Sequence, residues 1–186
     1  MKSKFDPQKR HRRSIRLKNY DYASQGAYYV TIVVQGRQCL FGEIIEGEMH
    51  LSKHGEIVQN WWNEIPMHFP NVKLGAFVIM PNHVHGIILI TDERRGEVIS
   101  PPNNPYPPLL RPALGQIVAY FKYQSTKEIN SIENTGTIAK VWQRNYYEHI
   151  IRNERDLQQK TDYILNNPSR WEDDREYPNK KSPGSR

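Results

Sequence analysis

The stretch 72–91, VKLGAFVIMPNHVHGIILIT, contains two apolar runs typical of β-strands, separated by Pro81 and Asn82. It predicts a hairpin with His83 and His85 at the start of the second strand. Because side chains alternate between the faces of a strand, both imidazoles project from one side. Two imidazoles on a rigid strand form half of a divalent-metal site. A hydrogen-bonded pair on a half-buried strand explains the same pattern equally well.

The rest of the chain alternates strand-like and helix-like segments around this hairpin. Ser52 and Asn153 are suitable N-caps for two helices, and Pro66 and Pro168 are expected to end them. The expected elements are a strand at 27–34, a peripheral hairpin at 43–51 turning at Gly47, a helix at 53–65, the hairpin at 72–91, a helix at 113–128, a strand-like or irregular segment at 141–151 and a last helix at 154–167.

Length and composition indicate one compact domain with loose ends, because 186 residues suffice for one proper core. We expect a basic N-terminal arm at 1–19, a domain at 20–170 that includes a proline-rich loop at 92–112, and a C-terminal tail at 171–186. The single cysteine excludes an internal disulfide and a thiolate zinc cluster. The sequence contains neither a signal peptide nor a membrane-spanning apolar run, so we expect a cytoplasmic protein without membrane contact.

The chain is basic, with a formal net charge of +6, which favours nucleic acid as a partner. Candidate phosphate contacts are Arg12, Arg13, Arg16, Lys18, Lys122, Lys127, Arg144 and Arg152. A solubilising role explains the basic arm equally well. Neither a phosphate-cradling glycine-rich loop nor a Gly-x-Ser-x-Gly elbow is present, so nucleotide hydrolysis and serine acyl transfer are disfavoured.

Tyr163 and Asn167, on the last expected helix, offer a completion of the metal site. Their i, i+4 spacing places both side chains on one helical face. If that face covers the histidine strand, Asn167 supplies an amide oxygen to Mg²⁺ or Mn²⁺ and the Tyr163 phenol points at a bound phosphodiester. Attack by the phenol then forms a covalent phosphotyrosine. Taken alone, Tyr163 is explained more simply as a core aromatic, and the sequence identifies no general base.

Five segments together resemble the single-tyrosine HUH transposases and, within them, the REP-associated tyrosine transposases. In chain order they are Tyr20–Tyr22, Gly26–Thr31, Val78–His85, Trp142–Asn153 and Asp162–Pro168. The resemblance implies an α+β fold with a ferredoxin-like (αβ-plait) antiparallel sheet, helices on one face and the histidine motif on a central strand. It also implies that the metal ligands are His83, His85 and Asn167 and that the nucleophile is Tyr163.

The same resemblance implies a reaction and a partner. The reaction is Mg²⁺- or Mn²⁺-dependent nicking of single-stranded DNA beside a palindromic hairpin, through a 5′-phosphotyrosine, followed by strand transfer. Insertion-sequence relatives form dimers with shared sites, whereas REP-associated ones can work as monomers, and the Asn-Pro ending at 167–168 favours a monomer. Two alternatives stay open: a domesticated DNA-hairpin-binding protein without turnover, and a metal-dependent hydrolase in which water is the nucleophile.

Overall fold

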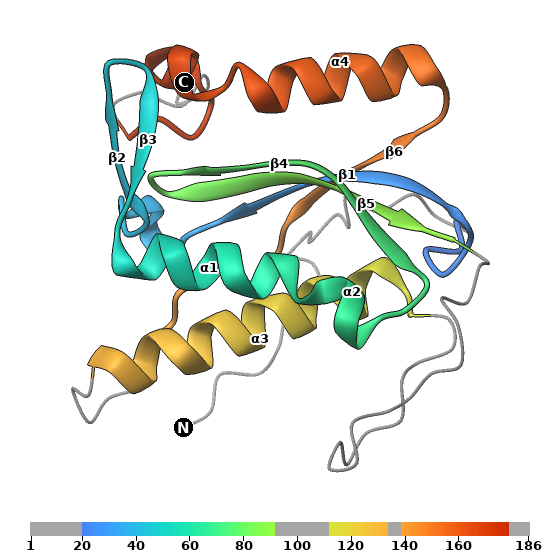
Figure 1. Ribbon diagram of the computed structural model, residues 1–186, viewed down its shortest axis with the longest axis horizontal. Helices are drawn as coiled ribbons and strands as arrows, with labels where there is room; N and C mark the ends of the chain where they lie inside the picture. Colours follow the sequence, from blue (N-terminus) through green and yellow to red (C-terminus); the bar gives the residue numbers. More distant parts are fainter. Residues whose placement is uncertain (1–19, 92–111, 134–138, 179–186) are drawn as a thin grey trace, which may run out of the picture.

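A computed structural model describes residues 20–91, 112–133 and 139–178, which contain an antiparallel four-stranded sheet covered by helices (Figure 1). Its strands are β1 (Gly26–Val33), β4 (Val72–Met80), β5 (His83–Ile90) and β6 (Tyr147–Ile151), in the order β4-β5-β1-β6. β4 and β5 form the expected hairpin. The prediction of an α+β fold with the histidine pair on a central strand is therefore confirmed.

The pairing of β5 with β1 determines which face the histidines occupy. His85 lies opposite Thr31, and His83 lies opposite Val33. Because side chains alternate along each strand, both imidazoles project from the same face as Tyr29 and Thr31. The other face carries the buried apolar side chains of Tyr28, Val30, Ile32, Val84 and Ile88. The sheet thus separates a polar, histidine-bearing face from a purely apolar one at this point.

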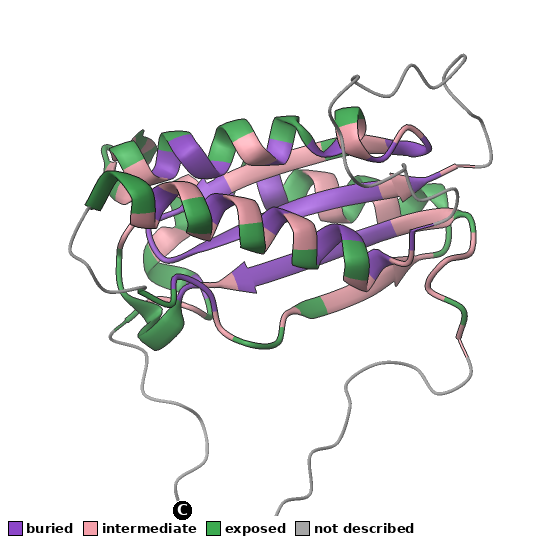
Figure 2. Ribbon diagram, turned by 90° about the horizontal axis from the view of Figure 1, so that it is seen from below, coloured by how far each residue is buried: buried purple, intermediate pink, exposed green. Residues whose placement is uncertain are grey.

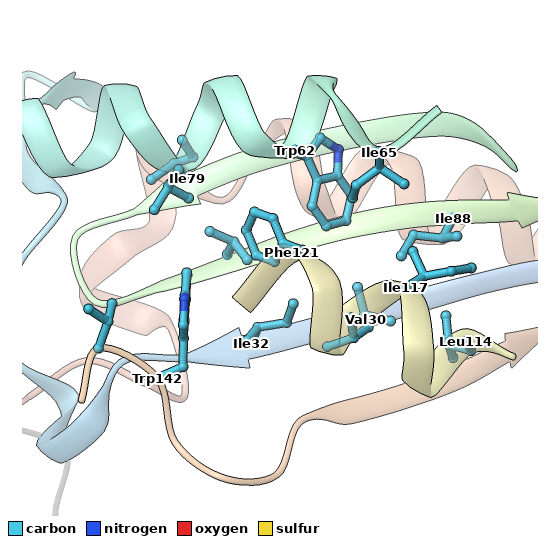
Figure 3. Packing of buried hydrophobic residues seen from close by; sticks show 14 of the residues in the cluster. Val30, Ile32, Trp62, Ile65, Ile79, Ile88, Leu114, Ile117, Phe121 and Trp142 are labelled. Atoms are coloured by element: carbon cyan, nitrogen blue, oxygen red, sulfur yellow. The ribbon is translucent and has the colours of Figure 1, made fainter. Parts of the chain in front are cut away.

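The apolar face is covered by α1 (Lys53–Asn63), α2 (Ile65–His68) and α3 (Leu114–Glu133), whose buried sides turn toward the sheet (Figure 2). Ser52 caps α1 as expected, accepting a hydrogen bond from the Gly55 amide at 3.2 Å. Figure 3 shows the large side chains of these helices meeting the sheet in the main core, among them Trp62, Ile65, Ile117 and Phe121.

α4 (Glu154–Leu165) lies on the opposite face, above β4 and β5 in Figure 1, so the expectation of helices on one face only is wrong. Its buried residue Ile164 joins Tyr29 and Ile87 in a second, smaller core. The physical reason is that β5 is buried from both sides, with Ile87 and the adjacent Ile88 both fully buried. A strand covered on both faces has a continuous apolar run, and residues 87–90 carry that signal.

The predicted peripheral hairpin forms a separate two-stranded sheet of β2 (Gly42–Ile45) and β3 (Glu48–Leu51). It turns where expected, through Glu46 and Gly47, which have φ angles of 52° and 83°. Two successive positive φ angles are typical of the type I′ turn that joins tightly paired strands. The turn approaches Ser169, so the hairpin lies beside the C-terminal segment.

Several boundaries differ from the predicted ones. Pro66 lies in the first turn of α2, where proline is tolerated, and α1 ends earlier, at Asn63. α3 continues past its predicted end to Glu133, while α4 ends at Leu165, two residues before Asn167. Residues 1–19 and 92–111 of the predicted arm and proline-rich loop lie outside the described residues. The division into arm, domain and tail stays a prediction.

No helix within the described ranges is both long and apolar enough to cross a membrane.

Gly86 on β5 lies directly against the indole of Trp62 from α1. A Cβ at this position would overlap Cζ2 of Trp62, whose indole is stacked on Phe77 with ring centroids 4.3 Å apart. We expect Gly86→Ala to lower the free energy of unfolding by about 1–3 kcal/mol through overpacking. The control is Gly26→Ala, where the new Cβ would lie 3.6 Å from Tyr28, in ordinary contact. Urea denaturation measures both variants, and equal midpoints would contradict the packing argument.

Candidate active site

His83 and His85 lie side by side on β5 and are almost completely buried, with 0% and 3% of their surfaces exposed. Their Nε2 atoms are 2.9 Å apart. Two ligand atoms at neighbouring positions of an octahedral ion, each about 2.1 Å from it, lie about 3.0 Å apart. The two imidazoles therefore have the spacing of adjacent ligands of one metal ion.

Asn82 determines the tautomer of His83. The Asn82 amide nitrogen donates to the backbone carbonyls of Arg37 and Glu176 at 3.2 and 2.8 Å. Its Oδ1 is left to accept a hydrogen bond from Nδ1 of His83 at 2.8 Å. His83 therefore carries its proton on Nδ1 and presents a lone pair at Nε2. Burial, together with the neighbouring His85, holds the pKa of His83 well below its usual value, so the ring is neutral.

Two hydroxyl groups of β1 orient the His85 ring. The Tyr29 and Thr31 hydroxyl oxygens lie 2.7 and 2.9 Å from its Nδ1. The Tyr29 ring also stacks on the imidazole, with centroids 5.5 Å apart and planes inclined by 21°. Partners of this kind fix the orientation of ligand histidines in metal sites. They direct Nε2 of His85 toward His83.

Asp174 is a functional candidate that the sequence analysis missed. It follows the 3-10 helix η2 (Pro168–Asp173), is 5% exposed and faces both imidazoles. Its carboxylate oxygens lie 3.9 Å from Nε2 of His83 and 3.8 Å from Nε2 of His85. Burial acts to raise its pKa, but the neighbouring imidazoles and the hydrogen bonds from Asn167 and the Glu176 backbone together outweigh burial and lower the pKa. The ionised carboxylate completes a His-His-Asp group that could bind a metal ion.

The sequence around Asp174 carries no signal that distinguishes it. The run WEDDREY at 171–177 contains four acidic residues, and only Asp174 among them is classed as buried. Acidic residues near the end of a chain are ordinarily solvated. Only the path of the chain through η2, after Pro168, brings this one carboxylate to the two histidines.

Tyr163 lies on α4 beside His85. This is the position expected if the last helix covers the histidine-bearing strand. The two ring centroids are 5.2 Å apart, and the tyrosine hydroxyl donates a hydrogen bond to Oδ2 of Asp174 at 3.0 Å. The residue is 44% exposed, so it is not a fully buried core aromatic. Burial of its hydroxyl end and the charge of Asp174 raise the pKa of Tyr163 to about 12. The phenol is therefore protonated at neutral pH.

Asn167 is buried within the same group. It lies beyond the end of α4 but keeps helical backbone angles, with φ −63° and ψ −43°, so it still follows Tyr163 on the same side. Its amide nitrogen donates to Oδ2 of Asp174 at 3.1 Å. Its Oδ1 is buried and has no hydrogen-bond partner within the described part of the chain. A buried carbonyl oxygen without a partner is suited to a cation.

Two of the predicted phosphate contacts, Lys122 and Lys127, lie on the face of the sheet opposite the histidines. Arg12, Arg13, Arg16 and Lys18 lie outside the described residues, and Lys122 and Lys127 lie on α3, across the sheet from α4 (Figure 1). The Lys122 ammonium donates to the backbone carbonyls of Gln143 and Arg144, and burial, with Lys140 nearby, lowers its pKa to about 8. Arg144 and Arg152 are exposed, and their contact with DNA stays a prediction.

Comparison with known proteins gives two similar sequences, both from Haemophilus influenzae, and no matching family model. The first, an uncharacterized protein, is 44% identical over 181 residues, covering 95% of this chain and 99% of that protein. The second, a proposed REP-associated tyrosine transposase, is 26% identical over 161 residues, covering 82% of this chain and 76% of that protein.

A solved structure of a REP-associated tyrosine transposase bound to a REP hairpin shares the fold. It superposes with a TM-score of 0.56 at 18% identity and covers 85% of this chain and 74% of that chain. The chain is related to the REP-associated tyrosine transposases. The resemblance drawn from the five sequence segments is therefore confirmed.

For this relative of the REP-associated tyrosine transposases, we expect Mn²⁺ to stabilise the fold through the His-His-Asp group. At about 100 times its Kd, a ligand stabilises by about 2.7 kcal/mol, which raises the Tm of a chain of this size by roughly 5 °C or more. Asp174→Asn should lose most of this shift, because it removes the anionic oxygen facing both imidazoles. Asp173→Asn, at the exposed neighbouring carboxylate, should retain it. Thermal unfolding with and without Mn²⁺ tests this, and equal shifts in the two variants would contradict the assignment.

Proposed function

We propose that this chain is a metal-dependent enzyme that nicks single-stranded DNA beside a hairpin and transfers the strand through a 5′-phosphotyrosine. One observation carries the proposal: the Tyr163 hydroxyl and the two imidazole nitrogens converge on one buried carboxylate, Asp174. A nucleophile and a metal-ligand set that meet at one point are what attack on a phosphodiester requires.

The donor set supports Mg²⁺ or Mn²⁺ as the metal. Imidazole nitrogens, a carboxylate and an amide oxygen are hard or intermediate ligands, and the 2.9 Å separation of the Nε2 atoms fits octahedral geometry. His83, His85 and Asp174 would hold the ion, and the unpartnered Oδ1 of Asn167 is a further oxygen ligand. When bound, such an ion polarises the phosphodiester and stabilises charge on the leaving oxygen.

In the proposed reaction, the Tyr163 oxygen forms a bond to phosphorus while the bond from phosphorus to the 3′ oxygen breaks. The products are a 5′-phosphotyrosine and a strand whose 3′ oxygen becomes a hydroxyl, because overall it takes up the proton that the phenol loses. Attack by a 3′-hydroxyl on the phosphotyrosine reverses the step, so strand transfer needs no nucleotide cofactor. Oδ2 of Asp174 accepts the phenolic hydrogen bond, but a pKa of about 12 is far too high for a carboxylate alone to ionise Tyr163.

The fold and the comparisons support a DNA hairpin as the partner. The order β-α-β-β-α-β of β1, α1, β4, β5, α3 and β6 is that of ferredoxin-like folds, with the β2–β3 hairpin inserted. The structural relative binds a REP hairpin, and the net charge of +6 suits a DNA partner. Tyr163 lies beside the histidines of its own chain, so the arrangement places the proposed nucleophile at the site without a residue from a second copy.

Trapping the covalent intermediate tests the nucleophile. A hairpin oligonucleotide with single-stranded flanks, taken from repeated palindromes of the source genome, is incubated with the protein and Mn²⁺ and analysed by denaturing electrophoresis. Wild type should form a protein–DNA adduct, and Tyr163→Phe should form none, because it lacks the attacking oxygen. Tyr123→Phe is the matched control and should still form the adduct, because Tyr123 is exposed on α3, across the sheet from the site.

The remaining outcomes identify the alternatives. An adduct in Tyr163→Phe would contradict this nucleophile. Cleavage without an adduct in wild type would support a hydrolase that uses water, and binding without cleavage would support a domesticated hairpin-binding protein.

A further inference from the structure

A cavity opens beside Tyr163, and Asn167 is not among the residues that line it. Its volume is about 470 Å³, within the range of sites that take small ligands. Tyr29, His85 and Tyr163 line it from the candidate active site, and Tyr147 and Lys160 line it from β6 and α4. The cavity is thus continuous with the proposed nucleophile and extends beyond the metal-ligand group.

Tyr147 places an accessible aromatic ring in this cavity. It is the first residue of the edge strand β6 and lies opposite Thr31, so its side chain shares the face of His85. Its ring contacts Tyr29 edge-on, with centroids 6.4 Å apart and planes at 71°. The residue is nevertheless 47% exposed, so much of this large ring is not used in packing.

Lys160 adds a positive charge to the same cavity. It precedes Tyr163 by three residues on α4, so the two side chains lie on neighbouring parts of one helical face. Its Nζ lies 5.1 Å from the centroid of the Tyr29 ring. Another cation of the lining, Arg37, is already paired with Glu176 at 3.0 Å. Lys160 is therefore well placed to attract a phosphate close to the Tyr163 hydroxyl.

We propose that this cavity binds one unpaired nucleotide of single-stranded DNA adjacent to the phosphate attacked by Tyr163, with its base stacked on Tyr147 and its own phosphate near Lys160. The inference rests on the proposed function, because it places the nucleotide relative to that nucleophile. Aromatic stacking and a nearby cation are how proteins hold single strands without reading a particular base. Tyr147 then positions the substrate and takes no part in the chemistry.

The binding test uses the full chain in EDTA, so that affinity is measured without cleavage. The probe is a fluorescein-labelled oligothymidylate, followed by fluorescence anisotropy. We expect Tyr147→Ala to raise the Kd about tenfold, as for loss of one base–aromatic stack, and Tyr147→Phe to bind nearly as wild type. Tyr123→Ala is the matched control, since Tyr123 is 65% exposed but lies on α3, across the sheet. Lys160→Ala should weaken binding and reduce its salt dependence.

A second readout locates the base directly. Thymidines are replaced by 5-iododeoxyuridine, the complex is irradiated, and the crosslinked peptide is identified by mass spectrometry. The expected crosslink is at Tyr147. No measurable binding by wild type, an unchanged Kd in Tyr147→Ala, an equal loss in Tyr123→Ala, or a crosslink confined to other residues would each overturn the inference.

These outcomes are separable from those of the proposed function. If wild type forms the Tyr163 adduct but Tyr147→Ala binds oligothymidylate unchanged, only the nucleotide cavity is wrong. If the Tyr147 effects appear but no adduct forms with Mn²⁺, the cavity binds single strands and the nicking reaction is wrong.

Discussion

The packing of Ile164 against Ile87 and Tyr29 holds α4 on the histidine-bearing face of the sheet. Ile164 is the only residue of α4 classed as buried, and burying one such side chain is worth roughly 1.5–3 kcal/mol. This small contact places the adjacent Tyr163 against the ring of His85. The large core on the other face stabilises the sheet, but the relation between the candidate nucleophile and the histidine pair depends on the second, smaller core.

Asp174 is where the polar groups of this face meet. Its carboxylate accepts hydrogen bonds from the Tyr163 hydroxyl, the Asn167 amide and the Glu176 backbone nitrogen. A buried charge must be compensated, and burial together with the neighbouring His85 holds the pKa of His83 well below its usual value. A divalent cation held by the two imidazoles and the carboxylate would compensate the charge of Asp174, in agreement with the geometry of the group.

Local signals in the sequence were enough for much of the fold. The apolar runs of 72–91 predicted the hairpin, Ser52 and Asn153 cap the helices expected of them, and the glycine at 47 marks the turn of β2–β3. Tyr163 and the two histidines are brought together as the family resemblance implied. The family resemblance implied helices on one face only, whereas the continuous apolar run at 87–90 is typical of a strand that is covered on both faces.

Residues whose role depends on long-range packing could not be recognised. Asp174 is one of several acidic residues in a polar segment, and only the path of η2 brings it to the histidines. The sequence predicts that Lys122 lies on the basic surface of a helix, where it would be free to contact phosphate. Its ammonium instead donates hydrogen bonds to two backbone carbonyls near Trp142. Burial and partners of this kind are set by tertiary contacts that no local spacing encodes.

The most direct measurement is the anomalous scattering of Mn²⁺ in crystals of the full chain. The account predicts one strong peak within ligand distance of both Nε2 atoms of His83 and His85 and of a carboxylate oxygen of Asp174, with the Tyr163 hydroxyl beside it. A peak elsewhere, or no peak between the two histidines in saturating Mn²⁺, would contradict the central claim that this face of the sheet is a metal-dependent site.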